Sequence, residues 1–295
     1  MIHGAAPANA YADSMIARVP ASSANLGPGF DALAVALNRY VEVEVRDADE
    51  FSIVTSGYGA GRFDDENHLG ARVAASVLGH QRFAIRVDSQ IPLSRGLGSS
   101  ASLALAAAAA AGAADALAIA VAIDGHAENA AASWRGGLVV AGQRDGTVAV
   151  ADLALDDVWR FVVVIPEVEL ATAEARRVLP DRVPFADAVA NLTALGLLIP
   201  GLADHRVFTS WSMDDRLHQP YRSALLPIAD SMLKALRDAG AHGACWSGAG
   251  STMLGLATVD AAAAVAEGAR RTLADHGVAG SVAILEADRI GAVVS

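Results

Sequence analysis

Residues 92–102 read PLSRGLGSSAS, and the residues that follow, as far as position 123, are mostly alanine, leucine and isoleucine. Gly96 and Gly98 allow the chain to close tightly around a ligand, because glycine adopts backbone conformations that other residues avoid. The apolar run predicts a helix, whose first turn carries unpaired N–H groups and partial positive charge. Such a helix start binds anions, and phosphate is the usual one. The stretch therefore predicts a phosphate-binding loop.

The letters GLGSSA also fit the G-x-G-x-x-A pattern of dinucleotide-binding folds. Those folds need a strand that runs straight into the first glycine, and a second strand with an acidic residue about twenty positions later. Here residues 91–95 intervene, and the next predicted strand begins only near Leu138, so a dehydrogenase is rejected. The G-x-x-x-x-G-K-[ST] pattern of P-loop ATPases is absent. Taken alone, the stretch still leaves an ordinary glycine turn before a helix as the alternative.

Composition limits the partners of the chain. Its 295 residues, 53% of them hydrophobic, suit one large domain or two moderate ones. The net charge of −11 argues against a nucleic-acid partner and means that an anionic substrate needs local cations. Lys234 is the only lysine, and Cys245 is the only cysteine. An intramolecular disulfide and a cysteine-cluster zinc site are thus excluded, which fits a reducing, cytoplasmic location.

Two segments bear on membranes. The first twenty residues lack a basic region followed by an apolar one, so no signal peptide is expected. The run 101–123 is the only membrane candidate, but it is mostly alanine and contains Gly112 and Asp115. A central aspartate is costly in lipid. We therefore expect a buried helix, broken near Gly112, and no membrane partner.

The remaining pattern predicts an α+β fold, because strands and helices do not alternate strictly. Expected strands cover residues 15–20, 40–45, 51–56, 83–87 and 161–165, a hairpin at 136–151, a strand pair at 244–256, and a last strand at 281–286 that closes the chain. Expected helices cover 65–78, capped by Asp64 and Asp65, then 101–123, 171–178, 185–198, 225–239 and 261–276. The buried strand FVVVI and Pro166 suggest two domains, 1–157 and 158–295.

Two further glycine-rich segments accompany the phosphate loop: SSANLGPGFD at 22–31 and SGAGST at 247–252. Together and in this order, the three resemble the three motifs of the GHMP small-molecule kinases. HAEN at 126–129, LATAEAR at 170–176 and LHQPYR at 217–222 resemble further segments of the homoserine kinases within that family. The resemblance extends from about Arg18 to Leu256.

The resemblance implies a two-lobed fold, with an N-terminal lobe of mixed β-sheet and helices and a C-terminal ferredoxin-like α/β sandwich. It implies transfer of the γ-phosphoryl group of ATP to the hydroxyl of L-homoserine, giving O-phospho-L-homoserine, with Mg²⁺ as cofactor. Phosphoryl transfer depends mainly on positioning and charge neutralisation. The nucleotide-binding residues that it implies are Asn67, Pro92, Arg95, Gly96, Leu97, Gly98, Ser99, Ser100, Ala101, Ser247, Gly248 and Gly250.

For the amino-acid substrate, the matching positions are Asn25, Asp31, His126, Asn129, Thr172, Arg176 and Arg222. Arginine suits the substrate carboxylate because its fork of donors matches two oxygens. Asp31, Ser100 and Arg176 are the implied catalytic contacts, and Ser100 and Asp124 the implied metal ligands. Whether Asp31 takes the hydroxyl proton stays open, as does a homodimer.

Three positions depart from the family pattern. Asp124 stands where the family has a glutamate, Glu128 where it has an aspartate, and Ser251 where it has a proline. These changes leave open a non-catalytic relative that binds ATP without turnover. Another kinase of the family, such as mevalonate kinase, is a further alternative. So is a plain α+β domain in which the glycine segments are only turns.

Overall fold

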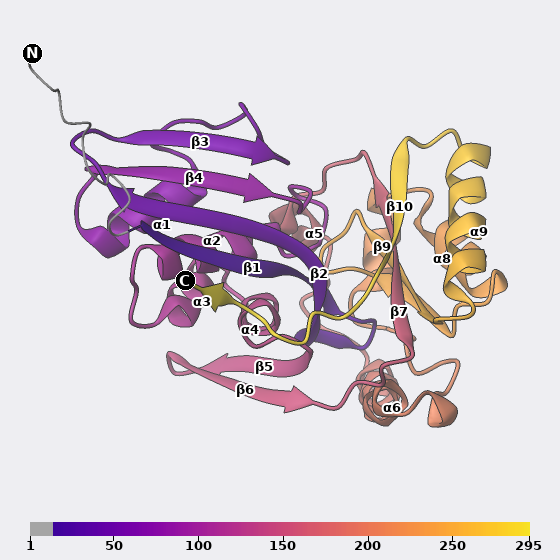
Figure 1. Ribbon diagram of the computed structural model, residues 1–295. Coiled ribbons are helices and arrows are strands. Elements are labelled where there is room, and N and C mark those ends of the chain that lie inside the picture. Colours follow the sequence, from indigo (N-terminus) through magenta and orange to yellow (C-terminus); the bar gives the residue numbers. More distant parts are fainter. Residues whose placement is uncertain (1–13) are drawn as a thin grey trace, which may run out of the picture.

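The computed structural model describes residues 14–295. The absence of a signal peptide was predicted from a segment that lies largely outside these residues. Two lobes lie side by side, each built on its own β-sheet (Figure 1). The predicted α+β class is confirmed.

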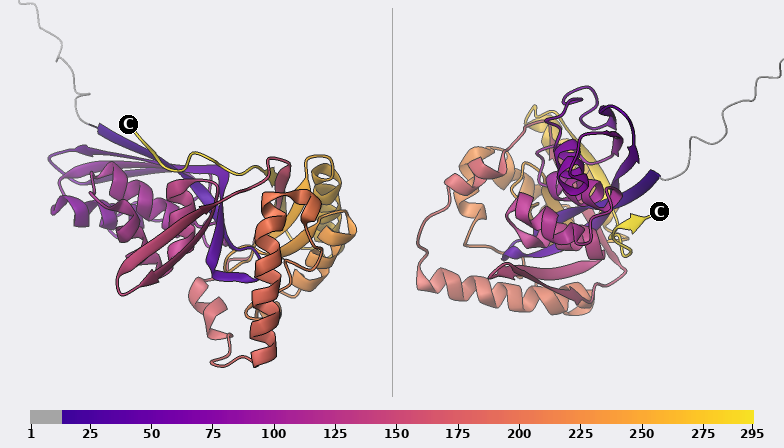
Figure 2. Two further views of the ribbon diagram at one scale, coloured as in Figure 1. Left: turned by 90° about the horizontal axis from the view of Figure 1, so that it is seen from below. Right: turned by 90° about the vertical axis from the view of Figure 1, so that its left-hand side faces the viewer.

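The first lobe holds a seven-stranded mixed sheet. Its central strand β2 pairs with β1, β4 and β5, and the parallel pair β3–β4 forms one edge. Four helices cover one face of this sheet (Figure 2). The strands of the sheet are β1 (Ser14–Asn25), β2 (Gly29–Asp47), β3 (Ser52–Gly57), β4 (Phe83–Ser89), β5 (Leu138–Arg144), β6 (Thr147–Leu153) and β11 (Val293–Val294). The helices are α1 (Leu69–Leu78), α2 (Ser99–Ala110), α3 (Ala116–Asp124) and α4 (Ala127–Arg135).

The alanine-rich run forms two helices rather than one. Helix α2 ends at Ala110, Gly112 adopts φ +80°, and the Asp115 side chain caps α3 by accepting from the Ala118 N–H. The break that we predicted near Gly112 is thus confirmed. Nearly every residue of α2 is buried between the sheet, α1, α3 and α4, which explains why small alanine side chains fill it.

The second lobe has the βαββαβ order of a ferredoxin-like unit. Its four antiparallel strands lie in the order β10-β7-β9-β8, with α8 and α9 beside the sheet (Figure 1). The strands are β7 (Trp159–Pro166), β8 (Gly243–Trp246), β9 (Met253–Thr258) and β10 (Gly280–Leu285). The helices are α5 (Thr172–Arg177), α6 (Phe185–Ala203), α7 (Gln219–Arg222), α8 (Ala229–Asp238) and α9 (Ala262–Asp275), with short 3₁₀ turns at His205–Val207 and Ser223–Leu225.

Two sequence predictions about chain ends and caps were wrong. The chain does not close on the strand near 281–286, because it returns to the first lobe and β11 pairs with β1. The helix predicted from residue 65 begins at Leu69, and its cap is His68, whose Nδ1 accepts from the Gly70 N–H at 3.2 Å. Asp65 instead accepts from the Asn67 N–H in the preceding turn.

The sequence analysis named the run 101–123 as the membrane candidate and did not name the segment that forms helix α6. Among residues 14–295, α6 is the one helix that is long and apolar enough to cross a membrane, judged by length and composition alone. Its buried face carries Asn191, whose amide donates to the Pro28 carbonyl at 2.8 Å and accepts from the Arg216 N–H. The helix thereby holds the turn of the first glycine-rich segment.

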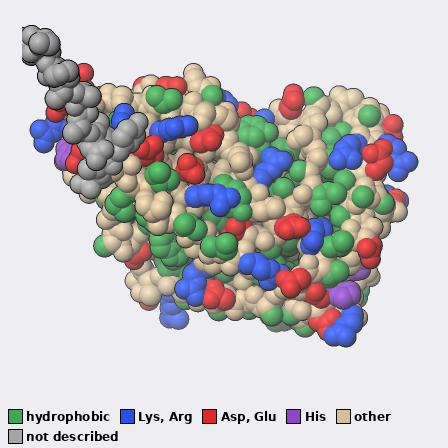
Figure 3. All heavy atoms as spheres, viewed as in Figure 1, with side chains coloured by type: hydrophobic (Ala, Val, Ile, Leu, Met, Phe, Trp, Pro, Cys, Tyr) green, Lys and Arg blue, Asp and Glu red, His purple; other side chains and the backbone are tan. Residues whose placement is uncertain are grey.

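Charged side chains of both signs are interspersed over the face of the molecule in Figure 3, and Lys and Arg do not gather in one area of that face. Together with the net charge of −11, this means that the anion site predicted at α2 has to depend on local donors rather than on a broad positive field.

Candidate active site

A cavity of about 130 Å³ opens where the two lobes meet. Its walls come from the ends of β1 and β2, the loop before α2, the α3–α4 connection, α5, α7 and the β8–β9 turn. The lining residues are Ala24, Asn25, Phe30, Asp31, Ser94, Gly96, Gly98, Ser99, Ser100, Asp124, His126, Glu128, Asn129, Leu170, Thr172, Arg176, Arg222, Gly248 and Ala249.

Direct hydrogen bonds join the three glycine-rich segments around this cavity. The Ser247 hydroxyl donates to the Gly96 carbonyl at 2.6 Å and lies 2.8 Å from the Ser23 hydroxyl. The Asn25 amide donates to the Gly248 carbonyl at 2.9 Å, and the Gly248 N–H donates to the Ala24 carbonyl. Segments far apart in sequence are therefore held in one rigid frame, as a preorganised site requires.

The loop before α2 has the form of an anion site. Gly98 is the N-cap residue, with φ +67° and no side-chain capping bond, so the N–H groups of the first turn stay available. Ser99 and Ser100 line the cavity, and the Ser100 side chain is exposed to it. Backbone donors and the helix dipole together favour a phosphate at this point.

Across the cavity, Asp31 and Arg176 form an ion pair, with Arg176 Nη2 2.6 Å from Asp31 Oδ1. Asn25 fixes Asp31 by accepting from its backbone N–H at 3.1 Å, and Asp31 itself has φ +55°. The Phe30 ring lies 5.5 Å from the guanidinium carbons of both Arg176 and Arg222. Two guanidinium groups on one aromatic ring can hold a carboxylate between them.

Buried carboxyl groups form the third wall. Glu128 is 3% exposed, and its Oε2 has no hydrogen-bond partner among the described residues. Burial, with smaller effects of Asp31 and Asp124, raises the pKa of Glu128 to about 7. Burial also raises the pKa of Asp124, and the nearby His126 opposes this. Glu128 therefore changes charge near neutral pH.

The neighbouring Asn129 is oriented by Ser22, which belongs to a group of three buried, hydrogen-bonded serines. The Ser22 hydroxyl donates to Asn129 Oδ1 at 3.0 Å, and the Ser133 hydroxyl donates to Ser22 at 3.2 Å. Ser133 also lies 3.2 Å from the Ser102 hydroxyl, and all three serines are fully buried. Since the Asn129 oxygen is engaged, its NH₂ group points toward Glu128, 3.4 Å away.

The pKa of Glu128 predicts a pH-dependent stability. A carboxyl whose pKa is raised from 4.5 to about 7 takes up a proton on folding, so stability falls as pH rises from about 4.5 to 7 and then levels off. Glu128→Gln removes the titration. The free energy of unfolding of this variant, relative to that of wild type, should therefore rise by about 2 kcal/mol between pH 5 and 8. Urea unfolding without nucleotide at both pH values measures this. Glu50→Gln, at an exposed position, is the control, and parallel pH profiles for wild type and Glu128→Gln would contradict the prediction.

The structure brings most of the sequence-predicted residues together. Thirteen of them line the cavity: Asn25, Asp31, Gly96, Gly98, Ser99, Ser100, Asp124, His126, Asn129, Thr172, Arg176, Arg222 and Gly248. Leu97 and Ala101 are buried beneath the loop, and Ser247 and Gly250 support it from the third segment. Asn67 lies exposed in the turn before α1 and outside the cavity. Pro92 and Arg95 line a separate cavity of about 260 Å³ beside the loop.

Phe30 was not predicted as a cavity residue, although it is the fourth residue of GPGFD at 27–31 in the first segment. Glu128 was treated only as a departure from the family pattern. No local pattern around position 128 indicated that this side chain is buried.

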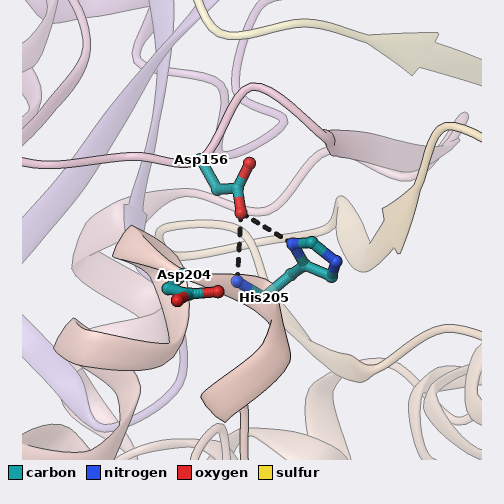
Figure 4. Close-up of side chains that lie close together, drawn as sticks. All are labelled: Asp156, Asp204 and His205. Carbon is teal, nitrogen blue, oxygen red and sulfur yellow. Dashed lines mark hydrogen bonds and ion pairs between the residues drawn. The ribbon is translucent and has the colours of Figure 1, made fainter.

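A second group of acidic residues lies away from this cavity. Asp156 Oδ2 accepts from the His205 backbone N–H and lies 2.7 Å from His205 Nδ1, with Asp204 close by (Figure 4). The Asp204 oxygens accept from Arg206, and Asp156 Oδ1 accepts from the Val158 N–H. These hydrogen bonds hold the chain before β7 to the end of α6. Because the oxygens already have partners, we propose no metal there.

Comparison with known proteins identifies the family. Residues 66–137 match the family described as GHMP kinases N terminal domain, and residues 198–275 match GHMP kinases C terminal. A homoserine kinase from Microchaete diplosiphon is 36% identical over 296 residues, covering 95% of this chain and 96% of the relative. One from Desulfitobacterium hafniense is 33% identical, covering 94% and 98%.

A solved structure agrees with these matches. The crystal structure of homoserine kinase from Cytophaga hutchinsonii has a TM-score of 0.85 and 29% sequence identity, covering 99% of this chain and all of that one. Its likeness extends over both lobes. With relatives this similar over nearly its whole length, the chain belongs to the GHMP kinase family, among the homoserine kinases.

Proposed function

We propose that this chain transfers the γ-phosphoryl group of ATP to the hydroxyl of L-homoserine, yielding O-phospho-L-homoserine and ADP. One observation carries the proposal: the helix start that favours phosphate and the two arginines that favour a carboxylate line the same cavity. The relatives named homoserine kinase support the choice of substrate.

The phosphates of ATP bind at residues 96–101. Backbone N–H groups of the loop and of the first turn of α2 hold them, and Ser247 and Gly250 keep the loop in shape from behind. The nucleoside extends toward the neighbouring cavity lined by Pro92 and Arg95, on the side of the exposed Asn67. Arg95 is held there because its Nε donates to the Pro166 carbonyl at 2.9 Å.

Homoserine binds at the opposite wall. Arg176 and Arg222 take its carboxylate, and Thr172 lies one helical turn before Arg176 on the same side of α5. Asn25, Asp31, His126 and Asn129 surround the rest of the molecule. Glu128 Oε2, buried and unpaired, offers an acceptor for the ammonium group.

The reaction forms a bond between the homoserine hydroxyl oxygen and the γ-phosphorus, breaks the bond from that phosphorus to the bridging oxygen of ADP, and releases the hydroxyl proton. The ion pair with Asp31 fixes the position of Arg176, so that the substrate is held in place for the transfer.

The residues present fit a magnesium ion, because the Ser100 hydroxyl and the Asp124 carboxyl group line the cavity and are hard oxygen donors. Ser100 and Asp124 are the residues that would hold it. When bound, Mg²⁺ neutralises charge on the phosphates of ATP. We further propose that the two domains divide at 157/158, although β11 returns to the first sheet.

A direct comparison of substrates tests the proposed function. With ATP and Mg²⁺, phosphate transfer to L-homoserine should exceed transfer to mevalonate by at least a hundredfold in kcat/KM, since mevalonate lacks the ammonium group and a buried acceptor left unpaired is penalised strongly. Coupled ADP release and mass spectrometry of the product measure both. Nucleotide binding without turnover of either compound would instead indicate a non-catalytic relative, and no nucleotide binding would contradict the anion site itself.

A further inference from the structure

His218 is completely buried between the first glycine-rich segment and Arg222. Its Nε2 lies 2.9 Å from the Gly27 carbonyl oxygen, and its Nδ1 lies 3.0 Å from Arg222 Nη1. The Phe30 ring stacks on the imidazole, with centroids 4.9 Å apart and planes inclined by 23°. Phe30 and Arg222 line the cavity, whereas His218 itself lies behind them and does not.

The two partners determine the tautomer of this histidine. A carbonyl oxygen can only accept, so Nε2 carries the hydrogen and donates to Gly27. A guanidinium can only donate, so Nδ1 is bare and accepts from Arg222. A protonated Nδ1 would place an N–H group against another N–H group at 3.0 Å. The imidazole is therefore neutral and donates only through Nε2.

The surrounding charges act in opposite directions. Burial is the main reason that the pKa of His218 is lowered to about 4; Arg222 acts in the same direction, whereas Asp215, the bond to the Gly27 carbonyl and the more distant Asp31 favour the charged form. Asp215 Oδ2 lies 3.5 Å from Nε2, but the same oxygen already accepts from the His218 and Gln219 N–H groups at 2.9 and 2.7 Å. The contact of Nδ1 with the guanidinium excludes the imidazolium, in agreement with the lowered pKa.

The bond from His218 fixes how Arg222 faces the cavity. Arg222 Nε donates to the Ala175 carbonyl at 3.2 Å, and Nη1 donates to both His218 Nδ1 and the Gly248 carbonyl at 3.0 Å. Nη2 has no protein hydrogen-bond partner in residues 14–295, and Arg222 lines the cavity while being only 2% exposed. The two hydrogens of Nη2 are thus the donors that remain for a ligand.

We propose that His218 is a positioning residue for the substrate carboxylate and acts through Arg222. It holds the guanidinium with Nη2 toward the cavity and links that group to the Gly27 turn. The proposal rests on the proposed function, in which the carboxylate is that of homoserine. It assigns His218 to substrate binding and not to proton transfer.

Two substitutions separate the two hydrogen bonds of His218. His218→Asn places an amide oxygen near the position of Nδ1 and keeps an acceptor for Arg222. His218→Gln reaches the position of Nε2 and keeps a donor for Gly27 but removes the acceptor. We expect His218→Gln to raise KM for homoserine tenfold or more and His218→Asn to raise it less than threefold, with KM for ATP unchanged in both.

Thermal melts of both variants provide the control, since each loses one buried hydrogen bond and both should be destabilised to a similar degree. Equal KM values for homoserine in the two variants, with a wild type that is active, would overturn the inference and leave the proposed function intact. A wild type inactive on homoserine would overturn the proposed function and, with it, the carboxylate role.

A spectroscopic measurement tests the tautomer without any substrate. In the full-length protein with ¹⁵N-labelled histidine, the signals absent from His218→Asn identify His218 among the eight histidines. They should show one bare and one protonated ring nitrogen, unchanged between pH 5.5 and 8. Titration in that range, or a hydrogen on Nδ1, would overturn the inference whatever the substrate proves to be.

Discussion

Replacing Arg176 or Arg222 by alanine should lower kcat/KM for homoserine by about ten- to a hundredfold and leave KM for ATP nearly unchanged. Each arginine would contribute hydrogen bonds to the substrate carboxylate, worth about 1.5–3 kcal/mol apiece, and 1.4 kcal/mol corresponds to a factor of ten. The phosphate loop lies on the other wall of the cavity and uses backbone donors, so nucleotide binding should persist. Steady-state kinetics with each substrate varied in turn measures both effects.

The matched control is Arg177→Ala, at the exposed position next to Arg176 on α5. Lysine at position 176 should restore only part of the activity, because a point charge cannot reproduce the fork that pairs with Asp31 and a carboxylate. Arg222→Ala removes the donor to the Ala175 carbonyl and to His218 Nδ1, while the Gly248 carbonyl keeps its bond from Asn25, so the folding of this variant must be checked by circular dichroism. Wild-type kcat/KM in Arg176→Ala, which is half-buried and should fold, would show that this arginine does not bind homoserine.

Local signals were sufficient to predict the glycine-rich loop and the helix that follows it. Gly96 and Gly98 precede an apolar run, and both adopt positive φ at the start of α2. The turn at Asp145 and Gly146 is similar, because both residues have positive φ and join two alternating strands. In each case the residues that decide the structure are neighbours in sequence.

Features that depend on distant packing could not be predicted in this way. Strand β11 has two residues, too few to show a period, and it exists because β1 offers an unpaired edge. The burial of Glu128 depends on how α4 packs on β1, β2 and α2, which no local pattern of charges reveals. His218 stands in a segment that resembles the family, yet its tautomer follows only from Gly27 and Arg222.

The second and third glycine-rich segments are in close contact at Gly96. A single methyl group added at this position should therefore cause a large loss of activity and stability. Gly96 has φ +72°, and a Cβ added there would lie 2.1 Å from the Ser247 carbonyl oxygen and 2.8 Å from the Gly250 nitrogen. Both neighbours are backbone atoms, which cannot rotate away as a side chain would. The loop would have to move off the third segment and break the bond from Ser247 to the Gly96 carbonyl.

Gly96→Ala should therefore lose most phosphotransfer activity and destabilise the fold by a few kcal/mol, within the range of strained or overpacked sites. Gly79→Ala is the matched control, because Gly79 has φ +74° but open space where the Cβ would lie. That variant should cost only about 1 kcal/mol, the penalty of a left-handed alanine. Urea unfolding gives both stabilities, and equilibrium nucleotide binding shows whether the loop still holds ATP. If Gly96→Ala behaved like Gly79→Ala in both measurements, the contact with Ser247 would not be what shapes the phosphate loop.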